Sequence, residues 1–214
     1  MNDNYDALNE FIGDALTPAL ASIEQAAVGV AAEDCPNLIL NALATENAIL
    51  QAARIKKLAG QINVTIHALG ILRCLPFILE DGEVIEYVSL GAGNTGRKFD
   101  LETNKRIAEF KFIHWKGGPE SIRQNSIFKD FFELSVAKTE KHKLLYLLGT
   151  EQALKFFAGG RSLISVLSKN EATRLKFREL YGDTYDTVRE YYETHSDSVK
   201  ILDVSEWLPE LVSF

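Results

Sequence analysis

Residues 99–112 place alternating charged and apolar residues on either side of a polar pair, Asn104-Lys105. This alternation is typical of two β-strands joined by a tight turn. If Asn104 and Lys105 are the two central residues of a hairpin turn, Asp100 lies directly across from Glu109 on the neighbouring strand. A register shifted by one residue would separate the two carboxylates, so the prediction depends on the turn.

The second strand of this hairpin has one charged face and one apolar face. Side chains two residues apart share a face, so Glu109 and Lys111 point one way and three apolar residues point the other way: Ala108, Phe110 and Phe112. Like charges that face each other across a sheet destabilise it, so the pair formed by Asp100 and Glu109 indicates a bound cation. The alternative is an exposed sheet face that carries a surface Glu–Lys pair.

The motif formed by Asp100, eight intervening residues and Glu109-Phe110-Lys111 resembles the PD-(D/E)XK nuclease superfamily. Phe99 stands where that motif has proline. The resemblance implies an α/β fold with a restriction-endonuclease-like core, in which helices flank a mixed central sheet. Its elements follow the order helix, three antiparallel strands, helix, strand.

The chain can be divided into elements in that order. Residues 37–58 and 119–137 have helical spacing, and strands are predicted at 83–90, in the hairpin and at 143–148. We expect a single domain over residues 1–214. It would comprise a helical N-terminal region at 1–75, a catalytic core at about 37–150 and a C-terminal helical extension at 151–214.

The resemblance also implies a chemistry, the metal-dependent hydrolysis of phosphodiesters, with DNA as the expected substrate. Asp100, Glu109 and the carbonyl of Phe110 would bind Mg²⁺, with Mn²⁺ as a substitute, because Mg²⁺ prefers oxygen ligands and keeps several waters. Lys111 would position or deprotonate the attacking water. The alternative is a catalytically inactive module on the same fold that binds nucleic acid or a protein.

Two further residues are candidates for the site by resemblance. Many family members add an acid from the helix before the sheet, and by order Glu46 is the acid that would serve as a metal ligand. Alternatively, Thr45 caps a helix and Glu46 is only an acid in its first turn. Gln124, four residues before Phe128, resembles a Gln-x-x-x-Tyr motif of related nucleases and would join the catalytic residues. Otherwise it is an ordinary polar residue before a core aromatic.

Glycine and histidine patterns near the motif receive no catalytic role. Residues 91–96 fit G-x-G-x-x-G, but the residues that follow alternate as a strand, whereas dinucleotide binding requires a helix to begin there. A loop between strands is the simpler interpretation. His67 has no partner at metal-ligand spacing.

Charge is distributed unevenly along the chain. The formal net charge is −7, yet residues 97–143 contain eleven Lys and Arg against seven Asp and Glu. Phosphate binding depends on clustered cations, so this basic region around the motif favours nucleic acid as the partner.

Compartment and assembly follow from simpler patterns. Cys35 and Cys74 lie in apolar surroundings without paired spacing, which predicts reduced thiols and a cytoplasmic protein. No membrane association is expected, because polar residues interrupt the most apolar stretch, 62–79. The apolar tail, 199–214, could cap the core or contact a second copy. Since cutting two strands usually needs two sites, we expect a homodimer.

Overall fold

The computed structural model describes residues 5–91, 98–118 and 120–213. Its contacts divide the chain into two compact units, Met1–Asn63 and Val64–Phe214. Their boundary falls inside the region 1–75 that we expected to be the helical start of a single domain. The catalytic core expected at about 37–150 therefore draws on both units.

The N-terminal unit is helical, and its elements in chain order are α1 (Asp6–Ile12), α2 (Leu16–Ala27), the 3-10 turn η1 (Ala32–Asp34), α3 (Cys35–Asn41) and α4 (Glu46–Ala59). Pro36 lies at the start of α3, where its missing N–H costs no helical hydrogen bond. Helix α1 packs against α4, and the Leu8 N–H donates to Gln51 Oε1 over 2.9 Å.

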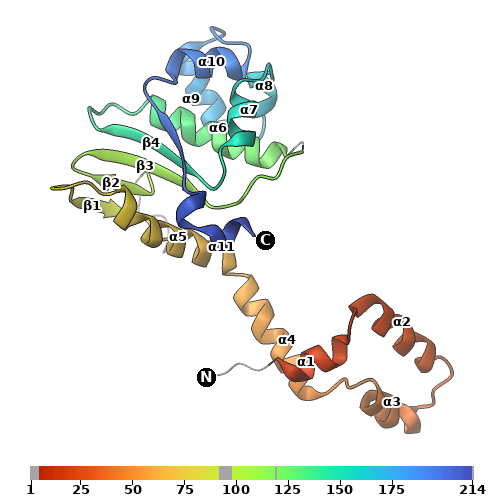
Figure 1. The fold of residues 1–214 in the computed structure, drawn as a ribbon. Coiled ribbons are helices and arrows are strands. Elements are labelled where there is room, and N and C mark those ends of the chain that lie inside the picture. Colours follow the sequence, from red (N-terminus) through yellow and green to blue (C-terminus); the bar gives the residue numbers. More distant parts are fainter. Residues whose placement is uncertain (1–4, 92–97, 119, 214) are drawn as a thin grey trace. The chain divides into compact units, whose positions relative to one another are not determined.

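The C-terminal unit is built on a five-stranded sheet in the order β1-β2-β3-β4-β5 (Figure 1). Its strands are β1 (Ile85–Val88), β2 (Leu101–Thr103), β3 (Arg106–Lys111), β4 (His142–Leu147) and β5 (Lys200–Asp203). Strands β1 to β3 are antiparallel, whereas β3, β4 and β5 are parallel. The protein is therefore an α/β protein with a mixed open sheet. The sequence patterns did not predict β5, which the tail adds beside β4.

The register of the central hairpin is the predicted one. Leu101 pairs with Ala108 and Glu102 pairs with Ile107. In the same register, Asp100 lies opposite Glu109. The two residues between the strands are Asn104 and Lys105, as the turn pattern indicated. A two-residue turn fixes the register, and with it the faces of every side chain that follows.

Helices cover both faces of the sheet (Figure 1). On one face, α5 (Ile62–Ile78), η2 (Ser205–Trp207) and α11 (Pro209–Val212) enclose a core that includes Ala108 and Phe110. On the other face, Ile107 packs in an aromatic core with a layer made of α6 (Ser121–Ser135), α7 (Glu151–Phe157), α8 (Leu163–Leu167), α9 (Glu171–Tyr181) and α10 (Val188–His195). The alternation predicted for β3 is confirmed, because Ala108 and Phe110 lie in one core and Ile107 lies in the other.

Helix α5 was not predicted as one helix. Its buried positions recur at helical spacing and face the sheet: Gly70, Ile71, Cys74 and Ile78. Pro76 lies near its end, within the last turn. Within the described residues, no single helix combines the length and apolar composition of a membrane span, although the bent pair α4 and α5 together meets that test by length and composition.

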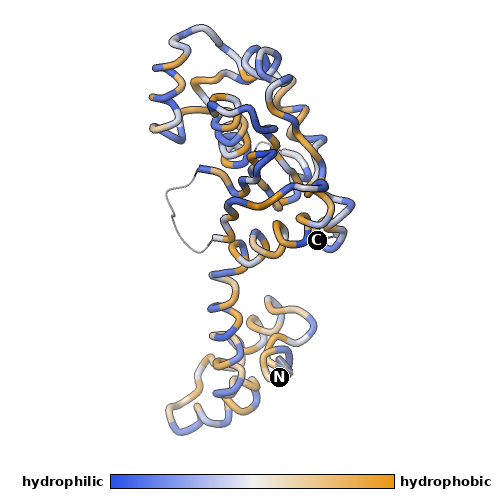
Figure 2. The backbone as a smooth tube through the Cα atoms, turned by 90° about the vertical axis from the view of Figure 1, so that its left-hand side faces the viewer, coloured by the Kyte–Doolittle hydropathy of each residue, from blue (hydrophilic) through white to orange (hydrophobic). Residues whose placement is uncertain are grey.

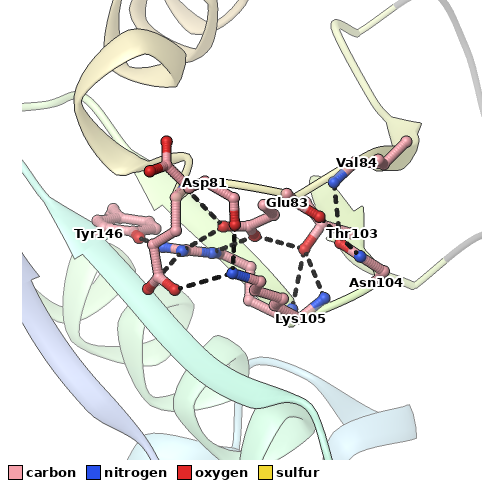
Figure 3. Close-up of polar contacts among 10 residues, drawn as sticks. Asp81, Glu83, Val84, Thr103, Asn104, Lys105 and Tyr146 are labelled. Atoms are coloured by element: carbon pink, nitrogen blue, oxygen red, sulfur yellow. Dashed lines mark hydrogen bonds and ion pairs between the residues drawn. The ribbon is translucent and has the colours of Figure 1, made fainter.

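A buried ion-pair network joins the hairpin to the loop that follows α5 (Figure 3). The Arg106 guanidinium donates to both carboxylate oxygens of Glu83, to Glu80 and to the hydroxyl of Tyr146. The Thr103 hydroxyl also donates to Glu83. This network fixes the turn end of the hairpin, while Glu109 and Lys111 lie toward the other end of β3.

Candidate active site

The two acids of the motif meet in the C-terminal unit. Asp100 directly precedes β2, Glu109 lies in β3, and the two carboxyl groups are close enough for each to shift the pKa of the other. The backbone N–H of Phe110 donates to Asp100 Oδ2 over 3.0 Å. Glu109 is buried, and 17% of the Asp100 side chain is exposed. Both carboxyl groups are therefore largely shielded from solvent, and Asp100 is the more accessible of the two.

The two carboxyl groups do not ionise alike. Burial raises the pKa of Glu109 to about 9, and the nearby charges of Asp130 and Asp100 act in the same direction. Burial would also raise the pKa of Asp100, but its contacts with His67 and with the Phe110 N–H hold that pKa below its ordinary value. Glu109 is therefore harder to ionise than Asp100.

Lys111 contacts a third acid, which the sequence analysis missed. Its Nζ lies 2.7 Å from Oδ2 of Asp130, a buried residue of α6. Burial would lower the pKa of Lys111, but the neighbouring charge of Asp130 outweighs it and raises that pKa. Lys111 is consequently an ammonium ion paired with Asp130.

Helix α5 contributes His67 to the same site. Its Nε2 lies 3.3 Å from Oδ1 of Asp100, so the acid is held from a helix on one side and from the Phe110 N–H on the other. His67 therefore has a partner in the fold that its sequence spacing did not reveal.

A glycine allows α5 to approach the strand closely enough for this contact. A Cβ atom at Gly70 would lie 2.7 Å from the ring of Phe112, which follows β3. Gly70 is three residues after His67, on the same side of the helix. A larger residue at this position would push α5 away from the sheet and His67 away from Asp100.

The donor set suits a hard divalent cation. Among the described residues, no group of three or more His, Cys, Asp and Glu side chains is arranged to hold a metal ion. Mg²⁺, however, needs only one or two carboxylates in addition to water and substrate oxygens. Asp100 and Glu109 can supply these, and the carbonyl of Phe110 lies 3.5 Å from Lys111 Nζ, at the centre of the site. A cation bound between the two carboxyl groups would favour the ionised form of both.

Glu46 lies in the first turn of a helix that Thr45 caps, as the alternative interpretation of this residue predicted. Thr45 caps α4 by accepting the Ala48 N–H, and Glu46 is an exposed acid in the first turn. It belongs to the N-terminal unit, whereas Asp100 and Glu109 belong to the C-terminal unit. The helix directly before the sheet is α5, whereas Glu46 lies in α4. A ligand role for Glu46 stays a prediction.

Gln124 lies in α6 and is buried, and its Oε1 has no hydrogen-bond partner within the described residues. Phe128, four residues later, is a fully buried core aromatic. The residue of α6 that contacts the motif is Asp130, which lies about 120° around the helix from Gln124. A catalytic role for Gln124 stays a prediction.

Four basic residues near the motif, besides Lys111, form ion pairs with acids outside it. Lys105 and Arg106 pair with Glu80, Arg123 with Glu120, and Lys141 with Glu86 and Glu102. The glycine motif at residues 91–96 falls outside the described residues from position 92 onward.

Two further lysines of this region, Lys98 and Lys129, border a shallow pocket of about 420 Å³, the lysine pocket, together with Glu133 and Lys176. An ion pair joins Glu133 to Lys176, so three ammonium groups surround one carboxylate. Lys98 is two residues before Asp100, and the charge of Lys129 acts on the neighbouring Asp130. The pocket therefore carries excess positive charge, and two of its lysines are close in sequence to Asp100 and Asp130.

Comparison with protein-family models, with curated proteins and with solved structures finds no match to this chain.

Two site residues escaped the sequence analysis, although each left a signal. Asp130 is a charged residue within the apolar face of α6, between Ile127 and Leu134 at helical spacing. His67 is likewise on the face of α5 that carries Ile71 and Cys74. A polar side chain on a buried helix face needs a partner, and in both cases that partner is a residue of the motif.

Proposed function

We propose that this protein is a metal-dependent phosphodiester hydrolase, a nuclease of the PD-(D/E)XK type that acts on DNA. The observation that carries the proposal is the placement of Asp100, Glu109 and Lys111 in one site, on adjacent strands in the register that the motif requires. The order α5, three antiparallel strands, α6, β4 supports a restriction-endonuclease-like core.

Asp100, Glu109 and the Phe110 carbonyl would hold Mg²⁺ or Mn²⁺. The bound cation neutralises charge that builds up on the phosphate oxygens and makes a water molecule easier to ionise. Asp100 is oriented for this by the Phe110 N–H and by His67. Glu109 must release its proton as the cation binds, so protons and the cation compete for the site.

Lys111 is better suited to positioning than to removing a proton. Its raised pKa keeps the ammonium charged at neutral pH, so Nζ can donate hydrogen bonds to a phosphate oxygen or to the attacking water. Asp130 holds this ammonium in place. We therefore assign Asp130 as a positioning residue that acts through Lys111.

The lysine pocket supports a nucleic acid as the substrate. A polynucleotide carries one phosphate per nucleotide, so a strand bound at Asp100 and Glu109 would bring further phosphates toward Lys98, two residues before Asp100. The described contacts give Lys98 and Lys129 no acidic partner comparable to that of Lys176. Phosphate oxygens would supply the missing negative charge.

We expect the double substitution Lys98→Gln and Lys129→Gln to weaken DNA binding and to reduce its salt dependence. Each lost phosphate contact should lower the slope of log Kd against log salt by about 0.7 to 0.9. Fluorescence anisotropy with a labelled oligonucleotide measures the Kd and its dependence on salt. The variants are made on an Asp100→Asn background to limit cleavage during the measurement. Lys155→Gln, on an exposed lysine of α7, is the matched control. An unchanged slope in the double variant would rule out phosphate contacts in the lysine pocket.

The activity itself is tested by incubating the purified protein with plasmid, linear duplex DNA, single-stranded DNA and RNA. Each reaction contains Mg²⁺, Mn²⁺ or a chelator, and the products are separated on a gel. Cleavage that requires the metal supports the proposal and identifies the substrate. Binding without cleavage under every condition would favour the alternative, an inactive nucleic-acid-binding module on this fold.

A further inference from the structure

The N-terminal unit has almost no core of its own. Of its described residues, 5–63, only Ala48 and Gln51 are buried. Eleven of its large apolar side chains are exposed: Leu16, Leu20, Val28, Ile39, Leu40, Leu43, Ile49, Leu50, Ile55, Leu58 and Ile62. Figure 2 shows apolar residues, in orange, along the helices of this unit. So small a unit needs a buried apolar core to stay folded, and here most of the apolar surface is uncovered.

Helix α4 shows where a covering partner would pack. Ala48, Gln51, Ile55 and Leu58 recur at intervals of three and four residues and form one stripe along the helix. Helix α1 packs against the first half of α4, where the stripe is buried. In the second half, 39% of Ile55 and 56% of Leu58 remain exposed.

The charges of this unit indicate what kind of partner fits. Residues 1–53 contain eight acids and no Lys or Arg, and three cations then follow within one turn of α4: Arg54, Lys56 and Lys57. The acidic helices would be repelled by nucleic acid and by an anionic membrane surface. A second copy carries the same acidic helices and the same basic segment. A two-fold axis can therefore place the basic segment of each copy against the acidic helices of the other.

We propose that two copies of this chain associate through their N-terminal units, with the two α4 helices antiparallel. The exposed half of each α4 then packs against α1 and the first half of the partner's α4. Its basic end, with Lys56 and Lys57, meets the acidic end of α1, at Glu10 and Asp14. The apolar stripe supplies the affinity and the charges fix the direction of pairing.

Sedimentation velocity over a range of concentrations tests the proposal on the full chain. The wild type should show a reversible species of twice the mass of one chain. Leu58→Asp should raise the dimer dissociation constant by about a hundredfold or more, because a symmetric interface loses the buried side chain twice. Leu175→Asp on α9 is the matched control, since Leu175 is 57% exposed and lies in the C-terminal unit. Circular dichroism checks that both variants keep their helices.

A charge exchange tests the direction of pairing. Lys56→Glu with Lys57→Glu in one protein, and Glu10→Lys with Asp14→Lys in another, should each weaken self-association. An equimolar mixture of the two should form a heterodimer of wild-type strength, because both charge contacts are then restored. A wild type that stays monomeric, a dimer that Leu58→Asp leaves intact, or binding to anionic vesicles in place of self-association would overturn the proposal. Its outcome is independent of nuclease activity.

Discussion

Asp100→Asn is expected to lower metal-dependent cleavage of DNA by about a hundredfold to a thousandfold. The substitution removes one negative charge from the cation site but keeps the shape of the side chain. The amide oxygen of asparagine can still accept the Phe110 N–H that Asp100 accepts now. The fold should therefore survive, and the loss should appear in initial rates measured with Mg²⁺ on the substrate that the wild type cleaves best.

Glu102→Gln is the matched control for this experiment. Glu102 lies in β2, two residues after Asp100, but its carboxylate pairs with Lys141 outside the acidic site. It should cleave at the rate of the wild type. Asp100→Asn that cleaves as fast as the wild type would disprove the assignment of the metal site. Loss of activity in both variants would instead indicate that the hairpin as a whole tolerates no change.

Arg106→Met is expected to lower the free energy of unfolding by about 3 to 5 kcal/mol at neutral pH. The side chain of Glu83 has no exposed surface and that of Arg106 is 6% exposed, so the substitution leaves a buried carboxylate without its main partner (Figure 3). Thr103 alone cannot replace the two-oxygen contact with the guanidinium. Urea unfolding followed by circular dichroism gives the difference.

The same pair should make the protein sensitive to acid. Burial opposes ionisation of Glu83, but hydrogen bonds from Arg106 and Thr103 outweigh it and hold its pKa below the ordinary value of 4.5. The unfolded chain therefore binds this proton more readily than the folded one. The stabilisation is complete above about pH 4.5 and is lost as the pH falls through the lower pKa of the folded state. Arg106→Met should lose less stability than the wild type over that acidic range.

Lys155→Met is the control for the stability measurement. Lys155 and Glu151 form an ion pair on the exposed side of α7, where water already solvates both charges. Its loss should leave the unfolding midpoint unchanged. If Arg106→Met lowered the free energy of unfolding no more than Lys155→Met does, the ion-pair network would contribute nothing to stability.

Local rules were sufficient to predict the hairpin and the faces of its side chains. A two-residue turn sets the pairing, and strand alternation then places Glu109 and Lys111 opposite Ala108 and Phe110. The helix at α6 and the strand at β4 also follow from patterns within single segments. These are properties of neighbouring residues, so they can be read from the chain alone.

The tertiary structure decided which distant residues complete the site. His67 and Asp130 reach Asp100 and Lys111 only because α5 and α6 pack on opposite faces of the sheet, and their helical patterns do not specify a partner. The addition of β5 beside β4 and the assignment of Glu46 to another unit depend likewise on contacts between segments far apart in the chain. The sequence by itself determined the paired strands that bring the two acids together. Packing determined which side chains surround them, because helix placement depends on how whole apolar faces fit rather than on any local signal.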